Sequence, residues 1–196
     1  MPRRDLTEER TAQILDAFAR CVVKYGLDGT SLEQVAEEAG VKRSILRHYV
    51  GNRDDLMNAM VERVVKKYSQ QLRMMVAYLP KAGNERIETL LSLLFQPEPD
   101  ESAQETFVFE TLIAAAGRYP QLRARLREPI EEFVDTVADQ LELVFPHAQQ
   151  QCWTVAYGIV SLYLTYASLA PLTLPQAHTE AALESARCLV ASLGQE

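Results

Sequence analysis

A short segment near the N-terminus gathers positive charge with no acidic residue among it. The cationic or titratable side chains of residues 41–53 are Lys42, Arg43, Arg47, His48 and Arg53. Ammonium and guanidinium groups bind phosphates, and an arginine fork also binds the paired acceptors on a guanine edge. The alternative is a solvated helix face without a partner. The structure predicted for the segments that carry these residues distinguishes the two interpretations.

The charge balance of the whole chain does not describe this segment. The chain has 196 residues, is 47% hydrophobic and 24% charged, and carries a formal net charge of −7, which is typical of a folded globular protein. Residues 1–53 contain 9 Lys and Arg against 8 Asp and Glu, whereas residues 54–196 contain 11 against 19. A basic patch on an otherwise acidic chain favours a site-specific nucleic-acid binder over a general polycation.

The sequence gives no support for an enzyme or a metalloprotein. Cys21, Cys152 and Cys188 lie far apart, lack metal-ligand spacing, and fit reduced, buried thiols. We find no glycine-rich phosphate loop and no GxSxG run. We therefore expect no catalytic residue, no metal and no cofactor.

A membrane or secreted location is also not expected. The N-terminal residues lack the apolar core of a signal peptide. The longest apolar stretch, residues 153–170, is interrupted by Thr154, Ser161 and Thr165, which suits a buried core helix better than a spanning one. The expected location is the cytoplasm.

Helical spacing of apolar residues dominates the chain and predicts an all-α fold of about nine helices. The expected helices cover residues 7–25, 32–39, 42–48, 53–78, 84–95, 102–117, 120–145, 148–170 and 176–193. Gly26 should end the first helix, Ser31 should cap the second with Gln34 in a capping box, and Asn52 should cap the fourth. We expect two domains, residues 1–55 and 56–196.

Residues 31–50, SLEQVAEEAGVKRSILRHYV, predict two helices joined by a tight turn. Ala36 is small enough for the helices to approach, and Gly40 can adopt the positive φ that the turn needs. The expected buried contacts are Val35, Ala39, Val41, Leu46 and Val50. The second helix then faces outward with Lys42, Arg43, Ser44, Arg47 and His48. This pattern favours a helix-turn-helix whose basic helix fits the major groove of DNA.

Residues 7–60 resemble the N-terminal domain of TetR/AcrR-type transcriptional regulators. The resemblance rests on TAQILDAFARCVVKYGLDGTSLEQVAEEAGV and KRSILRHYVGNRDDLMNAM. The matching positions are Gly26, Thr30, Val35, Ala36, Ala39, Gly40, Val41, Leu46, Asn52, Arg53 and Leu56. One position departs from the family pattern: Arg47 stands where relatives place a tyrosine, and the tyrosine occurs at Tyr49. Arg47 either contacts a phosphate or reads a guanine.

The resemblance and the chemistry of the side chains together suggest roles at DNA. Lys42, Arg43 and Ser44 should face base edges, and the hydroxyls of Thr30 and Tyr49 should reach phosphates. Arg53 and the amides at the start of its helix should bind another phosphate. The expected DNA-binding residues are Thr30, Ser31, Lys42, Arg43, Ser44, Arg47, His48, Tyr49 and Arg53.

The C-terminal two-thirds of the chain is less informative. Glu110 lies in the apolar run ETFVFETLIAAAG, so it faces solvent or an interface, pairs with an arginine, or awaits a cationic ligand. The candidate ligand-binding residues are Phe107, Glu110, Thr111, Phe133, Trp153 and Tyr157. The family resemblance implies that the last two helices pair with those of a second copy, forming a homodimer.

The resemblance therefore implies a dimeric, ligand-responsive transcriptional repressor that binds a palindromic DNA operator. A small-molecule effector in the C-terminal helical domain would favour a conformer that cannot bind DNA, and so release the operator. The alternative is a DNA-binding regulator whose C-terminal domain only dimerises or binds a protein partner.

Overall fold

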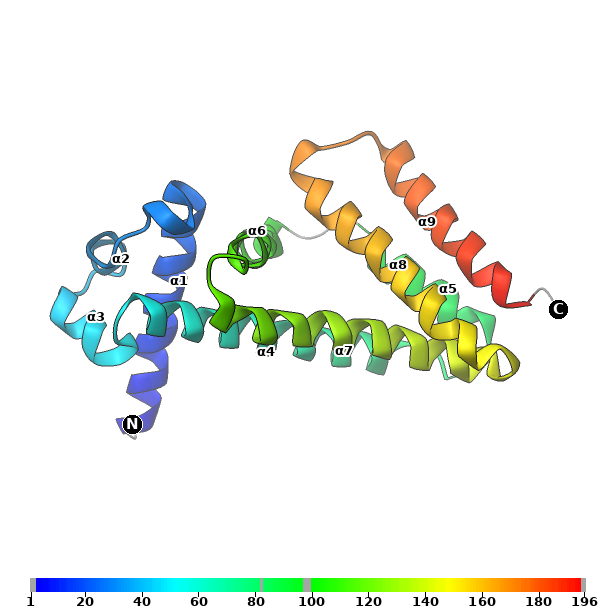
Figure 1. Ribbon diagram of the computed structural model, residues 1–196, viewed down its shortest axis with the longest axis horizontal. Coiled ribbons are helices and arrows are strands. Elements are labelled where there is room, and N and C mark those ends of the chain that lie inside the picture. Colours follow the sequence, from blue (N-terminus) through cyan, green and yellow to red (C-terminus); the bar gives the residue numbers. More distant parts are fainter. Residues whose placement is uncertain (1–2, 82, 97–99, 195–196) are drawn as a thin grey trace. The chain divides into compact units, whose positions relative to one another are not determined.

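The computed structural model describes residues 3–81, 83–96 and 100–194, and over these ranges the chain is all-α with nine α-helices and no strand, as expected (Figure 1). The helices are α1 (Arg3–Gly29), α2 (Leu32–Glu38), α3 (Arg43–Val50), α4 (Arg53–Tyr78), α5 (Asn84–Leu94), α6 (Asp100–Ala115), α7 (Pro120–Val144), α8 (Gln149–Leu169) and α9 (Gln176–Ala191).

The helices divide into two compact units, whose composition differs from the expected domains. The first unit contains residues 1–66 and 100–126, and the second contains residues 67–99 and 127–196. The expected boundary after residue 55 therefore lies inside the first unit. The first unit also includes α6, because α6 packs against α1. That contact joins segments far apart in the sequence, and apolar spacing cannot reveal which helices meet.

The end of α1 contains a break at the predicted glycine. Gly26 has φ 72° and ψ 167°, and the helix makes one further turn through Gly29. A positive φ of this size is readily adopted only by glycine. Leu27 is buried beyond the break, and Thr30 then leads into α2. The predicted stop at Gly26 thus occurs as a sharp change of direction within one helical segment.

The predicted capping box at the start of α2 is confirmed. The backbone N–H of Gln34 donates to Ser31 Oγ at 3.3 Å, and the backbone N–H of Ser31 donates to Gln34 Oε1 at 2.7 Å. These two bonds use donors that a helix start otherwise leaves without partners. This cap therefore defines where α2 begins.

We expect Ser31→Ala to lower the free energy of unfolding by about 1 kcal/mol, because Gln34 N–H loses its acceptor. Urea unfolding followed by circular dichroism measures the change. Ser44→Ala is the matched control, because Ser44 is exposed on α3 and the cap of α3 has no side-chain hydrogen bond. Equal losses for both variants would contradict a role for the Ser31 cap.

The start of α4 has the predicted asparagine cap. Asn52 Oδ1 accepts hydrogen bonds from the backbone N–H of Asp54 at 2.7 Å and of Asp55 at 3.1 Å. Asp55 Oδ2 in turn accepts from the backbone N–H of Asn52 at 2.9 Å. Both carboxylates also lie where the helix dipole favours negative charge. This cap fixes the direction in which α4 leaves α3.

The core of the second unit is formed by apolar side chains of α5, α7, α8 and α9. Its fully buried members include Leu90, Leu141, Cys152 and Ile159. The segment Pro146–Leu172 is long and apolar enough to cross a membrane, but core helices of soluble proteins share this property. In the structure one side of α8 supplies this core with buried side chains, but only 22% of the apolar window is buried, so the expectation of a buried core helix is met only in part.

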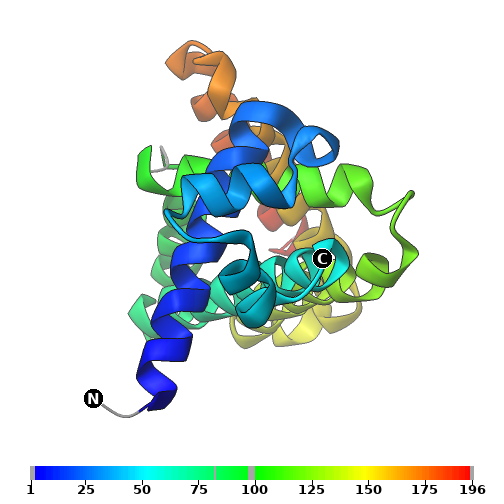
Figure 2. The same ribbon diagram turned by 90° about the vertical axis from the view of Figure 1, so that its left-hand side faces the viewer.

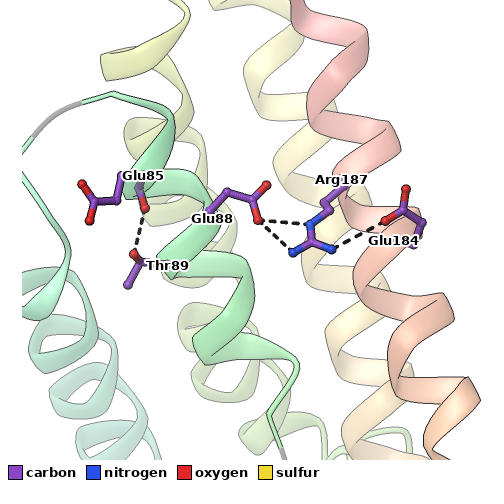
Figure 3. A network of polar contacts seen from close by, with 5 residues as sticks. All are labelled: Glu85, Glu88, Thr89, Glu184 and Arg187. Carbon is purple, nitrogen blue, oxygen red and sulfur yellow. Dashed lines mark hydrogen bonds and ion pairs between the residues drawn. The ribbon is translucent and has the colours of Figure 1, made fainter.

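Polar contacts join α9 to α5 at the edge of this core. The Nε and Nη2 atoms of Arg187 donate to Glu88 Oε2 at 3.1 and 2.9 Å, and Arg187 Nη1 lies 3.6 Å from Glu184 Oε2 (Figure 3). The Glu88 carboxylate raises the pKa of Arg187 above its usual value. Because these side chains are well exposed, the network adds little to stability.

The three cysteines are free thiols, and two of them are buried as expected. Burial raises the pKa of Cys21 and of Cys152, which keeps both in the unreactive thiol form at neutral pH. Cys188 is exposed on α9, so the expectation of a buried thiol is wrong at this position.

Candidate nucleic-acid interface

The helices α1, α2 and α3 form the predicted helix-turn-helix arrangement (Figures 1 and 2). Gly40 has φ 64° in the turn between α2 and α3. Val35, Ala39, Leu46 and Val50 are buried, whereas Val41 is partly exposed. The tight turn and most of the expected buried contacts are therefore confirmed.

The outer face of α3 is basic and accessible. The polar side chains that lie exposed there are Lys42, Arg43, Ser44, Arg47 and His48, and the apolar Ile45 is exposed on the same helix. Tyr49 is partly exposed, and its ring meets the His48 ring edge-on with centroids 5.2 Å apart. Among the residues that the structure describes, Lys42 and Arg47 form no ion pair, so both ammonium and guanidinium groups are available to an anion. This is the surface that the sequence predicted for DNA contact.

Two of the residues expected to bind phosphates form hydrogen bonds with backbone carbonyls of the chain itself. Thr30 is only 2% exposed, and its hydroxyl donates to Gly26 O at 2.7 Å. A hydroxyl that is buried and already donating is poorly placed to reach a phosphate. In this single chain the Thr30 hydroxyl closes the α1–α2 turn, and its expected contact with a DNA phosphate stays a prediction.

Arg53 also holds this turn. Its Nη2 donates to Leu27 O at 2.6 Å, and its Nη1 donates to Thr30 O. The guanidinium is thus bound to two backbone carbonyls on a part of the chain that precedes it by more than twenty residues. The geometry shows a clamp between the start of α4 and the α1–α2 turn. A guanidinium has five N–H donors, so the phosphate contact expected for Arg53 stays a prediction.

We expect Arg53→Met to lower the free energy of unfolding by about 1–3 kcal/mol, because two carbonyls lose their donor. If Arg53 serves only as this clamp, the salt dependence of DNA binding should stay unchanged. Thermal unfolding and a salt series of binding measurements test both points. Arg47→Met, on the exposed face of α3, is the control and should leave stability unchanged. If Arg53→Met keeps its stability but its DNA affinity depends less steeply on salt concentration, the result would support a phosphate contact by Arg53.

The same turn is held from its other side by residues that the sequence did not point to. Arg118 Nη2 lies 2.8 Å from Asp28 Oδ2, and the Tyr119 hydroxyl donates to Asp28 Oδ1 at 3.3 Å. Arg118 and Tyr119 belong to the connection between α6 and α7. Together with the packing of α6 on α1, these contacts link α6 to the helix-turn-helix within the first unit.

The candidate ligand-binding residues are divided between the two units. Phe107, Glu110 and Thr111 lie on α6 in the first unit, where Phe107 is 40% exposed and the Thr111 hydroxyl donates to Phe107 O at 2.8 Å. Glu110 is only partly exposed. These side chains form one accessible face of α6, opposite the buried face that includes Val108.

The other three candidates lie in the second unit. Trp153 and Tyr157 are 52% and 55% exposed on α8, and their rings stack with centroids 5.8 Å apart. Trp153 Nε1 donates to Asp135 Oδ1 at 3.1 Å, a partner that the sequence did not suggest. Phe133 packs edge-on against Tyr163 at 5.4 Å. In the single chain Trp153 and Tyr157 therefore form a surface patch of aromatic rings. Over the described residues, no group of His, Cys, Asp or Glu side chains could hold a metal ion.

Comparison with known sequences gives the class of this domain. Residues 14–60 match the family described as bacterial regulatory proteins, tetR family. A curated relative, the HTH-type transcriptional regulator BetI of Burkholderia thailandensis, is 38% identical over 66 residues. The match covers 34% of this chain and 34% of that relative. This chain thus spans about a third of the length of the curated relatives it matches.

Comparison with solved structures extends the likeness to nearly the whole fold. A TetR-family transcriptional regulator from Streptomyces coelicolor superposes with a TM-score of 0.74 at 16% identity, covering 95% of this chain and 91% of that one. A TetR transcription regulator from Haloarcula marismortui gives a TM-score of 0.73 at 15% identity, covering 94% and 98%. At these identities the likeness concerns the fold alone. Residues 14–60 thus match the tetR family of bacterial regulatory proteins, and the fold of the chain is similar to that of solved TetR-family regulators.

Proposed function

We propose that this protein is a transcriptional repressor that binds a palindromic DNA operator as a homodimer. The observation that carries the proposal is the exposed basic face of α3 in a TetR-type helix-turn-helix. An eight-residue helix with Lys42 and Arg43 at its start has the size and charge to enter the major groove. The relatives that share the domain are named as transcriptional regulators, which supports a regulator over an enzyme. We also propose a cytoplasmic location, because the relatives that share the domain are bacterial regulators.

The C-terminal helices support the dimer in this proposal. A two-fold operator needs two copies of α3 at a fixed separation, which a symmetric dimer supplies. On α8, Trp153 and Tyr157 present exposed aromatic rings, and aromatic residues are enriched at interfaces between proteins. Gly158 approaches Leu189 closely, so α8 and α9 can act as one surface. We assign this surface to the contact with the second copy.

We further propose that a small-molecule effector releases the operator. The supporting observation is that α6 carries three of the candidate ligand residues and packs against α1, the first helix of the DNA-binding segment. A ligand that prefers a shifted position of α6 would disturb α1 and, through Asp28, the α1–α2 turn. Its effect on DNA binding is limited to its difference in affinity for the two positions.

Selection from random duplex DNA tests the first part of the proposal. We expect a two-fold symmetric consensus, bound by a dimer in sedimentation experiments at a fixed salt concentration. Failure to enrich any sequence would overturn the assignment of the α3 surface. Enrichment of a single half-site by a monomer would overturn the dimer.

A screen of small molecules against the protein–operator complex tests the effector. Release by one compound, with loss of that release in Thr111→Ala or Glu110→Gln, would support a site on α6. A compound that binds without changing operator affinity would contradict the release mechanism. An operator complex that no compound disturbs would favour the alternative in which the C-terminal helices only dimerise or bind a protein.

A further inference from the structure

We propose that Glu33 is a positioning residue for DNA recognition: it holds the Arg43 guanidinium at the start of α3 so that Arg43 reads a guanine base. The inference rests on the proposed DNA-binding function and deepens it, because it assigns a base contact to one side chain and a supporting role to an acidic one. The resemblance already suggests that Arg43 faces base edges, but it suggests neither guanine as the base nor a supporting role for Glu33.

The proposal starts from an ion pair between two helices of the recognition surface. Glu33 lies in the first turn of α2, and Arg43 is the first residue of α3. Arg43 Nη1 contacts Glu33 Oε1 across the packed α2–α3 pair. The dipole of α2 favours a negative charge at Glu33, so the carboxylate is held where Arg43 can meet it. The other basic side chains of α3, Lys42 and Arg47, have no such partner among the described residues.

The charge of Glu33 makes a phosphate an unfavourable partner for Arg43. A phosphate brought to the free side of the guanidinium would also approach the Glu33 carboxylate, and two anions near each other repel. A guanine edge presents O6 and N7, which are neutral acceptors and avoid this repulsion. The ion pair uses Nη1, and a guanidinium has five N–H donors in a fixed plane. Donors therefore remain for a bidentate contact with guanine while Glu33 fixes the plane.

The exposure of the pair separates this role from a role in folding. The side chains of Arg43 and Glu33 are 54% and 58% exposed, and ion pairs so exposed contribute little to stability. Loss of the Glu33 charge should therefore leave the fold intact and act on recognition. A second ion pair on the same helix provides a control: Arg20 Nε of α1 lies 2.5 Å from Glu38 Oε1 of α2, and neither residue belongs to α3.

The experiment compares Glu33→Gln with Glu38→Gln, which removes the same charge from the same helix. For each full-length protein, base preference is measured by selection from random duplexes and by affinities for single-base variants of the selected site. The unaltered protein should prefer guanine at one position of each half-site by about 5- to 150-fold, the range for a good bidentate contact. Glu33→Gln should lower this preference by up to about fivefold, the most that so exposed an ion pair can contribute, whereas Glu38→Gln should keep it. Both should bind non-specific DNA slightly more tightly, because each loses one negative charge.

Arg43→Lys tests the base contact itself. Lysine keeps the positive charge but lacks the planar fork, so guanine preference should fall at the same position as in Glu33→Gln while the salt slope of binding stays unchanged. Preserved preference in Arg43→Lys would show that the planar fork held by Glu33 does not select guanine, and would overturn the proposal. Equal base preference in Glu33→Gln and Glu38→Gln would also overturn it. If the unaltered protein itself enriches no sequence, the DNA-binding function fails first, and this outcome is recognisable before any variant is compared.

Discussion

Replacing Lys42 and Arg43 together with Ala lowers operator affinity by at least about a hundredfold at constant salt, since each copy in a dimer loses two contacts worth about 1 kcal/mol or more. Both side chains are exposed at the start of α3, so their removal leaves no buried group without a partner. The circular dichroism spectrum and the dimer should therefore be unchanged. Fluorescence anisotropy with a labelled operator measures the loss.

The matched control for this pair is Lys81→Ala with Arg123→Ala. It removes one lysine and one arginine from exposed positions outside α3, so the change in net charge is the same. We expect operator affinity to change by a few-fold at most, through long-range electrostatics that salt screens. A loss as large as that of the α3 pair would mean that overall charge, and not the face of α3, determines binding.

The features that sequence patterns predicted correctly are local ones. The Ser31–Gln34 capping box, the Asn52 cap and the positive φ of Gly40 each depend on residues within three or four positions of one another. These local interactions do not depend on how the helices pack, so the residue types alone are enough to predict them. The same holds for the outward basic face of α3, which follows from helical spacing once Leu46 is placed inside.

The features that the sequence could not supply depend on contacts between distant segments. Arg53 matched the family pattern but binds Leu27 O, and Asp28 is held by Arg118 from the α6–α7 connection. The packing of α6 against α1, in the first unit, is also a contact between distant segments. Such contacts depend on which faces meet after packing, and many arrangements bury the same apolar stripes.

The burial of charged side chains is a further feature that the sequence did not predict. The sequence drew attention to Glu110 because it lies in an apolar run, yet Glu110 is partly exposed. The buried charge is Arg86 of α5, which is 9% exposed and hydrogen-bonded to the buried amide of Gln140 on α7. Arg86 lies in an ordinary amphipathic stretch, and only the packing of α5 against α7 turns its side chain inward.

Arg86 is expected to matter strongly for the stability of the second unit. Its Nε donates to Gln140 Oε1 at 3.0 Å and its Nη2 to the same oxygen at 2.5 Å, while Nη1 donates to Pro80 O. Arg86→Met keeps most of the volume but leaves both acceptors without a donor, at about 1–3 kcal/mol for each buried group. We expect the free energy of unfolding to fall by about 2–4 kcal/mol and Tm to fall by about 4–16 °C.

Two further variants decide whether the cause is the lost hydrogen bonds. Arg127→Met makes the same chemical change at a side chain that is 69% exposed and, over the described part of the chain, pairs with Glu131 in the same helix, so Tm should barely move. In the double variant Arg86→Met, Gln140→Leu the orphaned amide is also removed, so part of the lost stability should return, because replacing both partners by apolar groups can be nearly neutral. A double variant less stable than Arg86→Met alone would mean that Gln140 stabilises the second unit through its own bond to Thr136 O, at 3.2 Å, more than through Arg86.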